Sequence, residues 1–308
     1  MINHRLFLIL VLFGLLVSGN IAQDDDPASV PTWDGDSRFT VLIAGMDRRP
    51  EARDTLSVRT DAILLLSVDP QNERIGILHI PRDLHFVPPN EEEFVRVNSL
   101  LVFGEQIDDG YGPGYMLGTL QYNLGMYIDR YLLVDFEAFI TLVDAIGGVN
   151  ISIDYVINDP TYPDMNYGYD PFYLNAGEHT LDGYDALRFA RTRHGDNDFL
   201  RGERQLQVIS ALQTRLTEAE TLPRLLAQAP DLLDTLEDNI YTDLTLDEMI
   251  ALATYGLALE TDALITGAMR GDYIMTFTQP GGSTIYVPAR SELVELLTSV
   301  FGEGYTGQ

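Results

Sequence analysis

The sequence predicts an α/β protein in which a mixed β-sheet is flanked by helices. Short apolar runs rich in β-branched residues alternate with longer amphipathic stretches, as strands alternate with helices in layered α/β folds. Two of these runs, 62–68 and 75–80, surround the polar turn Asp69-Pro70-Gln71-Asn72, which predicts a hairpin. Apolar residues make up 45% of the 308-residue chain, which is enough for a sizeable core.

The predicted elements follow one another along the chain. We expect strands at 39–44, 62–68, 75–80, 131–134, 149–153, 263–269 and 284–287. Helical patterns are expected at 114–125, 136–146, 181–190, 199–216, 222–229, 246–259 and 291–301. Gly147-Gly148 is expected to end the second helix, and the Asp-, Tyr- and Pro-rich stretch 158–175 to form a loop.

Residues 1–22 predict a signal peptide or an N-terminal membrane anchor. A short basic start is followed by the uncharged apolar run 6–17, which is shorter than the roughly 20 residues that span a bilayer as a helix. Small residues at 18–22 offer a cleavage site, and an uncleaved anchor is the alternative. Residues 23–37 are expected to be a linker rich in Asp and Pro. Either way, we expect the protein outside the cytoplasmic membrane, secreted or anchored to its outer face.

The composition excludes several classes of function. A net charge of −28 argues against nucleic-acid binding, because a phosphate backbone needs a basic face. The absence of cysteine excludes zinc–thiolate sites, disulfides and a Cys nucleophile. All 19 basic residues are arginine, so a Walker-type lysine and a Schiff-base lysine are also excluded.

The arginines are clustered rather than scattered. Ten of the 19 fall in three short segments: Arg48, Arg49, Arg53, Arg59, Arg82, Arg188, Arg191, Arg193, Arg201 and Arg204. Surface ion pairing would spread them more evenly, since an exposed pair gains only ~0–1 kcal/mol. Guanidinium groups bind phosphate oxygens bidentately, so the clustering indicates an anion site. The alternative is that Asp185, Asp196, Asp198 and Glu203 neutralise the last cluster.

Two aspartates lie at the ends of strands that are expected to be neighbours. Asp47 follows the first predicted strand, and Asp61 opens the second. Two carboxylates that converge at a sheet end suit Mg²⁺, which takes few protein oxygens and leaves positions for phosphate. Each aspartate can also cap a turn or pair with the arginine beside it, and the spacing by itself favours that simpler explanation.

Two further segments place donors where a ligand can reach them. Pro81 ends the third strand and directs Arg82 away from the sheet edge. In a helix that begins at the natural N-cap Asp198, Arg201 and Gln205 are four residues apart and share a face.

In this order, the motifs resemble the LytR–CpsA–Psr (LCP) family of cell-wall phosphotransferases. The strings that carry the resemblance are IAGMDRR, RTDAILLLSVDP, IGILHIPRDLHF, RVNSL, VDFEAFITLVDAIGGVNI, LDGYDALRFARTR and DFLRGERQ. They cover roughly 39–216 of a catalytic domain expected at 38–308, whose part 217–308 is expected to be helical. The resemblance implies an α-β-α sandwich with an apolar pocket for a polyprenyl chain.

The resemblance also implies an activity: Mg²⁺-assisted transfer of a glycopolymer from polyprenyl pyrophosphate to an envelope acceptor such as peptidoglycan, at the membrane surface. It implies that Asp47 and Asp61 hold the metal. The residues expected to act in catalysis are Arg82, Arg191, Arg193, Asp198 and Arg201. Those expected to bind substrate are Arg59, Arg82, Asp83, Arg96, Arg191, Arg193, Arg201, Arg204 and Gln205, where Arg96-Val97-Asn98 replaces the family's usual Lys-Ile-Asn.

Two other functions stay open at this point. With water as the acceptor, the same site gives a polyprenyl-pyrophosphate pyrophosphatase. A non-catalytic lipid- or glycan-binding regulator of the envelope is the third possibility, and the presence of the full Asp and Arg set argues against it.

Overall fold

A computed structural model describes residues 33–48, 55–164, 168–192, 198–216 and 264–306, together with short pieces between 218 and 255. The expected signal or anchor at 1–22 and the helix expected at 222–229 lie outside the described residues. Within the part of the chain that the structure describes, no helix is both long and apolar enough to cross a membrane.

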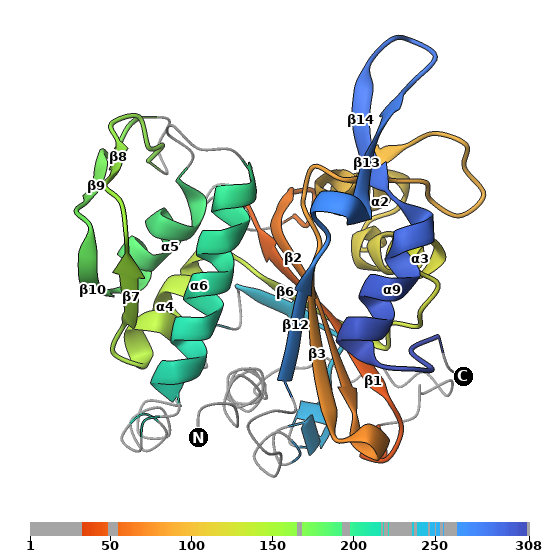
Figure 1. The fold of residues 1–308 in the computed structure, drawn as a ribbon, viewed down its shortest axis with the longest axis horizontal. Helices are drawn as coiled ribbons and strands as arrows, with labels where there is room; N and C mark the ends of the chain where they lie inside the picture. The colour runs from red at the N-terminus through yellow and green to blue at the C-terminus, as the bar shows by residue number, and fades with distance from the viewer. Residues whose placement is uncertain are drawn as a thin grey trace.

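A six-stranded sheet forms the centre of the molecule (Figure 1), in the order β11-β6-β1-β2-β3-β12. Its strands are β1 (Phe39–Met46), β2 (Thr60–Asp69), β3 (Arg74–His79), β6 (Arg130–Val134), β11 (Ile240–Thr242) and β12 (Leu264–Ala268). β2 runs antiparallel to both β1 and β3, so the predicted hairpin is confirmed. β6 is parallel to β1 and β12 is parallel to β3, which makes the sheet mixed, as expected.

This topology brings the ends of several strands to one edge of the sheet. β1, β3, β6 and β12 all run in the same direction, so their carboxyl ends meet there. The start of β2 lies at the same edge, where the amide of Ile80 donates to the carbonyl of Ile63. In open α/β sheets this is the edge at which ligands bind.

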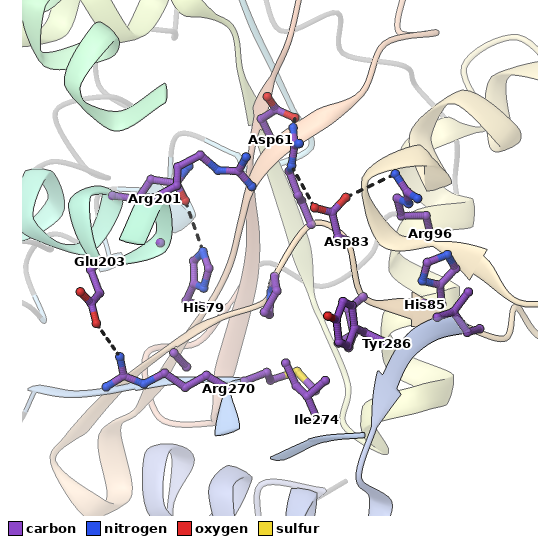
Figure 2. Close-up of a pocket in the computed structure, with 18 of the residues that line it drawn as sticks. Asp61, His79, Asp83, His85, Arg96, Arg201, Glu203, Arg270, Ile274 and Tyr286 are labelled. Carbon is purple, nitrogen blue, oxygen red and sulfur yellow. Dashed lines mark hydrogen bonds and ion pairs between the residues drawn. The ribbon is translucent and has the colours of Figure 1, made fainter. Parts of the chain in front are cut away.

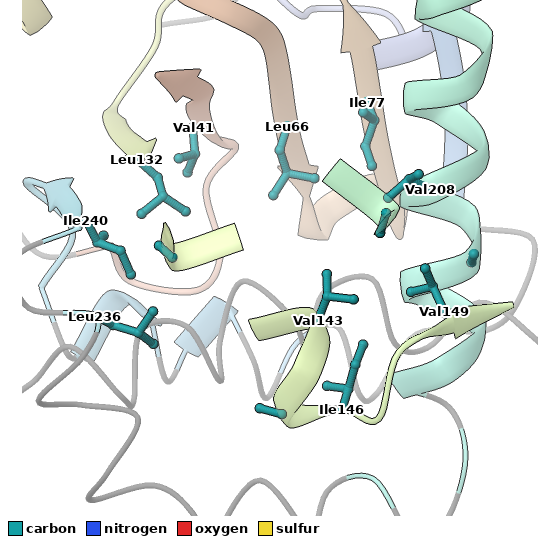
Figure 3. Packing of buried hydrophobic residues seen from close by; sticks show 14 of the residues in the cluster. Val41, Leu66, Ile77, Leu132, Val143, Ile146, Val149, Val208, Leu236 and Ile240 are labelled. Atoms are coloured by element: carbon teal, nitrogen blue, oxygen red, sulfur yellow. The ribbon is translucent and has the colours of Figure 1, made fainter. Parts of the chain in front are cut away.

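Helices cover both faces of the sheet because successive strand residues point to opposite sides. On one face, Val41, Leu66 and Ile77 belong to the core that includes residues of α4 (Phe136–Ala145), α5 (Gly183–Arg191) and α6 (Asp198–Leu216), as Figure 3 shows. On the other face, Leu42, Ile63 and Leu78 belong to the core with residues of α2 (Leu100–Ile107), α3 (Gly112–Leu124) and α9 (Arg290–Phe301). The sheet is therefore the middle layer of three (Figure 1).

Local sequence explains where some of the helices begin and end. The carboxylate of Asp135 accepts a hydrogen bond of 3.0 Å from the amide of Ala138 and caps α4. Asp182 caps α5 in the same way through the amide of Asp185, at 2.8 Å. Gly125 ends α3 in the left-handed conformation, with φ of 66°, which glycine adopts without steric cost.

Several short elements were not predicted. The stretch expected to be a loop contains a hairpin of β8 (Ile157–Asp159) and β9 (Phe172–Leu174). β7 (Val149–Ile153) pairs with β10 (Gly177–Leu181) outside the central sheet. The other missed elements are α2, β4 (His85–Phe86), β5 (Val95–Arg96), β11, the 3₁₀ turns η2 (Pro70–Asn72), η3 (Val97–Ser99) and η4 (Gly271–Tyr273), and β13 (Ile274–Thr278). Strands of two or three residues carry too little alternation to be recognised in a sequence.

The C-terminal part is more than helical. Besides α9 it supplies β11 and β12, which are the two edge strands of the central sheet. It also forms a hairpin of β13 and β14 (Thr284–Pro288). At the other end of the described chain, Trp33 is buried and stacks on Phe39 with ring centroids 5.2 Å apart, so the end of the expected linker packs on the fold.

Candidate functional site

A cavity of about 450 Å³ lies at the carboxyl edge of the sheet (Figure 2). Five segments of the chain contribute charged side chains to its wall. Asp61 comes from the start of β2, Arg82 from the loop after β3, Arg96 from the end of β5, Arg201 from α6 and Arg270 from the loop after β12. In Figure 2 the side chain of Arg201 extends from α6 toward the side of the cavity where Asp61 lies. The fold thus collects residues from three widely separated stretches of the chain.

A row of alternating charges runs along one wall. The guanidinium of Arg82 lies 2.5 Å from the carboxylate of Asp61 and 3.6 Å from that of Asp83. Asp83 in turn lies 3.4 Å from the guanidinium of Arg96. The side chain of Arg82 is 12% exposed and that of Arg96 is 49% exposed, so the row leads from the interior to the solvent.

The cavity is cationic in a strongly acidic protein. Its wall contains four arginines, Arg82, Arg96, Arg201 and Arg270, against the three carboxylates of Asp61, Asp83 and Glu203. The chain as a whole carries a net charge of −28. Local excess of guanidinium groups in such a chain suits a phosphate or another anion.

His79 contributes to this wall as a neutral side chain. It ends β3 on the face covered by α6, and its Nε2 lies 3.3 Å from Oε1 of Gln205. Burial, together with the nearby charges of Arg201 and Arg270, lowers the pKa of His79 to about 4. A neutral imidazole therefore fixes Gln205 at neutral pH without adding positive charge.

A second group of residues surrounds Asp47. Its carboxylate lies 3.3 Å from the guanidinium of Arg191 at the end of α5. That guanidinium stacks over the ring of Phe136 at 4.0 Å and donates to the hydroxyl of Tyr162 at 3.2 Å. The amide of Asp47 donates to the carbonyl of Arg59 at 2.7 Å, which keeps Asp47 at the same edge as the start of β2.

Arg48 stabilises this edge of the sheet through buried contacts. Its guanidinium is buried and lies 3.0 Å from the carboxylate of Asp135. Asp135 is also the residue that caps α4. It also donates to the hydroxyl of Tyr241 on β11, at 2.5 Å. Because a buried charge is retained only when it is paired, this contact fixes the backbone beside Asp47.

The structure separates the expected site residues into several environments. The cavity wall contains Asp61, Arg82, Asp83, Arg96, Arg201 and Gln205. Arg191 and Asp47 form the neighbouring group described above. Arg59 is exposed and is not part of the wall. Arg193 lies outside the described residues, and of Asp198 the structure describes only that it begins α6.

Arg204 has an environment that the sequence does not suggest. It is almost completely buried, and its guanidinium donates to the carbonyl of Phe189 at 2.9 Å and to the carbonyl of Thr192. Phe189 lies in the last turn of α5 and Thr192 directly follows the helix. The last carbonyls of a helix have no hydrogen-bond partner within it, and Arg204 supplies donors to these two. Its position indicates that it supports the segment that carries Arg191.

The alternative explanations for the charged residues hold in part. Asp47 and Asp61 each pair with an arginine, although with a distant one rather than with the arginine beside it. Asp185 neutralises Arg188 at 2.5 Å, and Glu203 lies 3.5 Å from Arg270. Asp196 lies outside the described residues. Among the residues that are described, no group of three or more His, Asp or Glu side chains is arranged to hold a metal ion.

Sequence reasoning missed Arg270. It lies two residues after the end of β12, as Arg82 lies three residues after the end of β3, and these two strands are parallel neighbours. An arginine after a predicted strand was therefore the available signal. Its significance depends on the position of β12 at the edge of the sheet, which the sequence does not reveal.

The fold and this site define the class of protein. A sequence profile of the LytR_cpsA_psr family matches residues 18–300, and the chain belongs to this family. Similar curated proteins include the polyisoprenyl-teichoic acid–peptidoglycan teichoic acid transferase TagU of Oceanobacillus iheyensis, which is 30% identical over 82% of this chain and 76% of its own length. TagT of Bacillus subtilis, with the same descriptive name, is 28% identical over 74% of this chain and 66% of its own length.

Solved structures agree on the fold. TagV of B. subtilis superposes with a TM-score of 0.64 at 22% identity, over 86% of this chain and 96% of that one. A structure of TagT bound to LIIa-WTA gives the same TM-score and identity over 92% of this chain and 99% of that one. The expected α-β-α arrangement with a mixed central sheet is confirmed.

Proposed function

We propose that the protein transfers a glycopolymer from a polyprenyl-pyrophosphate carrier to a cell-envelope acceptor such as peptidoglycan. The observation that carries this proposal is the convergence of Arg82, Arg96 and Arg201 on one cavity at the carboxyl edge of the sheet. The similar transferases named above support it, since their names describe a polyisoprenyl-linked donor and a peptidoglycan acceptor. Such a reaction takes place outside the cytoplasmic membrane, at its surface.

In this proposal the pyrophosphate binds along the row of charges. Arg82, Arg96 and Arg201 bind its oxygens, with Gln205 as a neutral donor held by His79. Arg191 lies at the same edge and binds the phosphate that faces the acceptor. Asp61 and Asp83 position the Arg82 guanidinium before substrate arrives, so that little reorganisation is needed.

Asp47 and Asp61 supply too few oxygens to bind Mg²⁺ by themselves, so they fit this ion only when the phosphates of the substrate supply others. Asp47 and Asp61 supply carboxylates at the ends of paired strands, and each lies against an arginine. Mg²⁺ commonly takes one or two carboxylates and fills its other positions with phosphate oxygens and water, which is consistent with a donor set this small. We propose that Asp47 and Asp61 hold Mg²⁺, which neutralises charge on the pyrophosphate when bound.

For this phosphoryl transfer, the protein must position the substrate and stabilise the charge that develops. An acceptor hydroxyl oxygen forms a bond to the sugar-linked phosphorus, while the bond from that phosphorus to the bridging oxygen breaks. The proton of the hydroxyl passes to water, and polyprenyl phosphate leaves with the bridging oxygen and its electron pair. Negative charge grows on that oxygen, and the arginines of the cavity stabilise it. Asp198, Arg193 and Asp83 stay predicted contributors to this step.

The experiment is a transfer assay with a polyprenyl-pyrophosphate-linked oligosaccharide that carries a fluorescent label on the sugar. Wild-type protein with Mg²⁺ is expected to attach the label to added peptidoglycan. Arg82→Ala and Arg201→Ala are expected to lower the rate by at least about 10²-fold, as the loss of a charge-stabilising donor does in other enzymes. Arg290→Ala changes an exposed arginine outside the cavity and serves as the matched control.

The same assay separates the alternatives. Release of labelled sugar phosphate at a rate that added acceptor does not change would indicate the pyrophosphatase. Binding of the lipid-linked sugar without any turnover, and unchanged by Arg82→Ala, would indicate the non-catalytic binder and would reject the proposal.

A further inference from the structure

The hairpin of β13 and β14 carries no charge in a highly charged protein. Charged residues make up 21% of the chain, but there are none between Asp272 and Arg290. The hairpin extends away from the helices and the sheet, at the end of the molecule where the cavity lies (Figure 1). A projecting ribbon of a soluble protein normally carries charged side chains, so this one has an unusual surface.

Both faces of this ribbon expose large apolar side chains. Met275 pairs with Val287 and Phe277 with Ile285, which puts these four on one face, whereas Tyr286 pairs with Thr276 on the other. Met275, Phe277 and Tyr286 are 52%, 40% and 54% exposed. A ribbon that packs one face on its own protein would present a polar face to water. This ribbon is uncharged on both sides: one face exposes Met275 and Phe277, and the other exposes Tyr286 among threonines.

The hairpin is continuous with the cavity. Ile274, Ile285 and Tyr286 form part of the cavity wall. Figure 2 shows Tyr286 on the side of the cavity where His85 and Arg96 lie. A β-bridge between Leu84 and Tyr286 ties the hairpin to the loop that carries Arg82. Apolar side chains of the two strands, rather than of the tip, therefore adjoin the cavity that contains the arginines.

We infer that the β13–β14 hairpin is the element with which the protein contacts the lipid bilayer. Met, Phe and Tyr side chains favour the interfacial region of a bilayer, where an apolar body meets water. Anionic lipids repel the acidic body of the protein over about a Debye length, ~8–10 Å, whereas the ribbon itself adds no charge to this repulsion. The exposed Glu91–Glu93 lie close to its base, since the ring of the next residue, Phe94, is 5.2 Å from that of Phe277. This charge pattern favours a lipid surface over a protein partner.

The inference rests on the proposed function in one respect. If the donor is a lipid pyrophosphate, the hairpin guides its chain from the bilayer while the phosphates reach Arg82 and Arg96. Contact between the hairpin and lipid can nevertheless be measured without any turnover.

The absence of cysteine makes a direct measurement possible, because a single introduced Cys takes up one fluorescent label. Gly281→Cys places the label at the tip of the hairpin, where an added Cβ meets no atom within 4 Å and the backbone has no positive φ. Gln71→Cys is the matched control, since it is exposed on the β2–β3 turn at the opposite end of the sheet. Full-length protein is reconstituted with phosphatidylcholine–phosphatidylglycerol vesicles that contain a lipid-borne quencher near the headgroup.

We expect the label at position 281 to shift its emission to shorter wavelength and to be quenched several-fold more than the label at position 71. Met275→Ser combined with Phe277→Ser should reduce the quenching at position 281 to the level of the control. The readout is the depth of the label rather than binding, so an N-terminal anchor does not affect it. Equal, weak quenching at both positions would overturn the inference, including the case in which the hairpin binds another protein.

A second measurement separates this inference from the proposed function. The Met275→Ser/Phe277→Ser variant is expected to be several-fold slower with a long-chain donor embedded in vesicles and unchanged with a short-chain, water-soluble donor. If neither donor is turned over while position 281 is quenched, the proposed function fails and the hairpin contact stands. If both donors are turned over while position 281 stays unquenched, the hairpin contact fails alone.

Discussion

The guanidinium of Arg82 lies 2.5 Å from the carboxylate of Asp61, although the two residues stand at opposite ends of the β2–β3 hairpin sequence. Antiparallel pairing of β2 and β3 brings the start of one strand beside the end of the other. Asp61 is the proposed metal ligand of this pair, and Arg82 is the proposed phosphate-binding residue. A change at Asp61 therefore tests both roles.

We expect Asp61→Asn to raise the Mg²⁺ concentration needed for half-maximal transfer by at least about tenfold, since the loss of groups around a metal site typically costs 10- to 100-fold in affinity. Titration of the transfer rate with Mg²⁺ is the measurement. Asp83→Asn makes the same chemical change at another aspartate of the cavity wall and should leave the Mg²⁺ dependence unchanged. Identical shifts in both variants would contradict a metal-binding role for Asp61.

Arg96 and Arg204 are expected to differ in what their loss affects. Arg96 is half-exposed on the cavity wall, so Arg96→Ala should lower kcat/KM about tenfold or more, while the free energy of unfolding changes by less than about 0.5 kcal/mol. Arg204→Lys replaces the guanidinium fork that donates to the carbonyls of both Phe189 and Thr192 with one smaller ammonium group, and should cost about 1–3 kcal/mol of stability. Denaturant unfolding and steady-state rates distinguish the two. A stable Arg204→Lys protein with a raised KM would instead show that Arg204 binds substrate.

The stability of the protein should depend on pH through His79. Burial lowers its pKa to about 4, whereas in the unfolded chain it is near 6.5. Between these values the unfolded chain binds more protons than the folded one, so stability falls as the pH drops from about 6.5 toward 4, by at most about 3 kcal/mol. Gln205, Arg201 and Arg270 are the groups that face the ring.

The measurement is the difference in unfolding free energy between pH 7 and pH 5.5, for wild type and for His79→Gln. Other titrating groups contribute equally to both proteins, so the difference isolates His79. The variant is expected to lose less stability over this interval. Parallel pH profiles would mean that His79 is protonated in the folded protein as readily as in the unfolded chain.

Two glycines provide a matched test of packing. A Cβ on Gly76 in β3 would lie 2.6 Å from the ring of Phe301 and from the carbonyl of Val300, so Gly76→Ala should destabilise the fold by about 1–3 kcal/mol. A Cβ on Gly118 in α3 would meet no atom within 4 Å, so Gly118→Ala should stabilise the fold by up to about 1 kcal/mol. Thermal unfolding measures both. A neutral Gly76→Ala would show that α9 is less closely packed on β3 than the structure indicates.

Much of the fold follows from local sequence. The β2–β3 hairpin, β1, β6, α4 and α9 were predicted with bounds within about two residues, because a period of two or 3.6 is visible in a single segment. The missed β8–β9 hairpin was assigned to a loop because its strands are only three residues long. β7 was recognised as a strand, but its partner β10 was not, since strand partners are chosen by contacts between distant segments.

The same division applies to the site. The sequence indicated the clustered arginines and the two aspartates, because residue type and spacing are properties of the chain. It did not indicate that Asp47 faces Arg191, that Arg204 is buried beneath the end of α5, or that Arg270 joins Arg82. Each of these relationships depends on the order of strands in the sheet or on helix packing across more than one element.

By itself, then, the sequence determined the chemistry available to this protein: guanidinium and carboxylate groups, no thiol and no amine side chain, on alternating strands and helices. The tertiary structure decided which of these groups share one cavity and which only support it. The physical reason is that charge and periodicity are encoded locally, whereas the distance between two side chains is fixed by the parallel and antiparallel pairings that close the sheet.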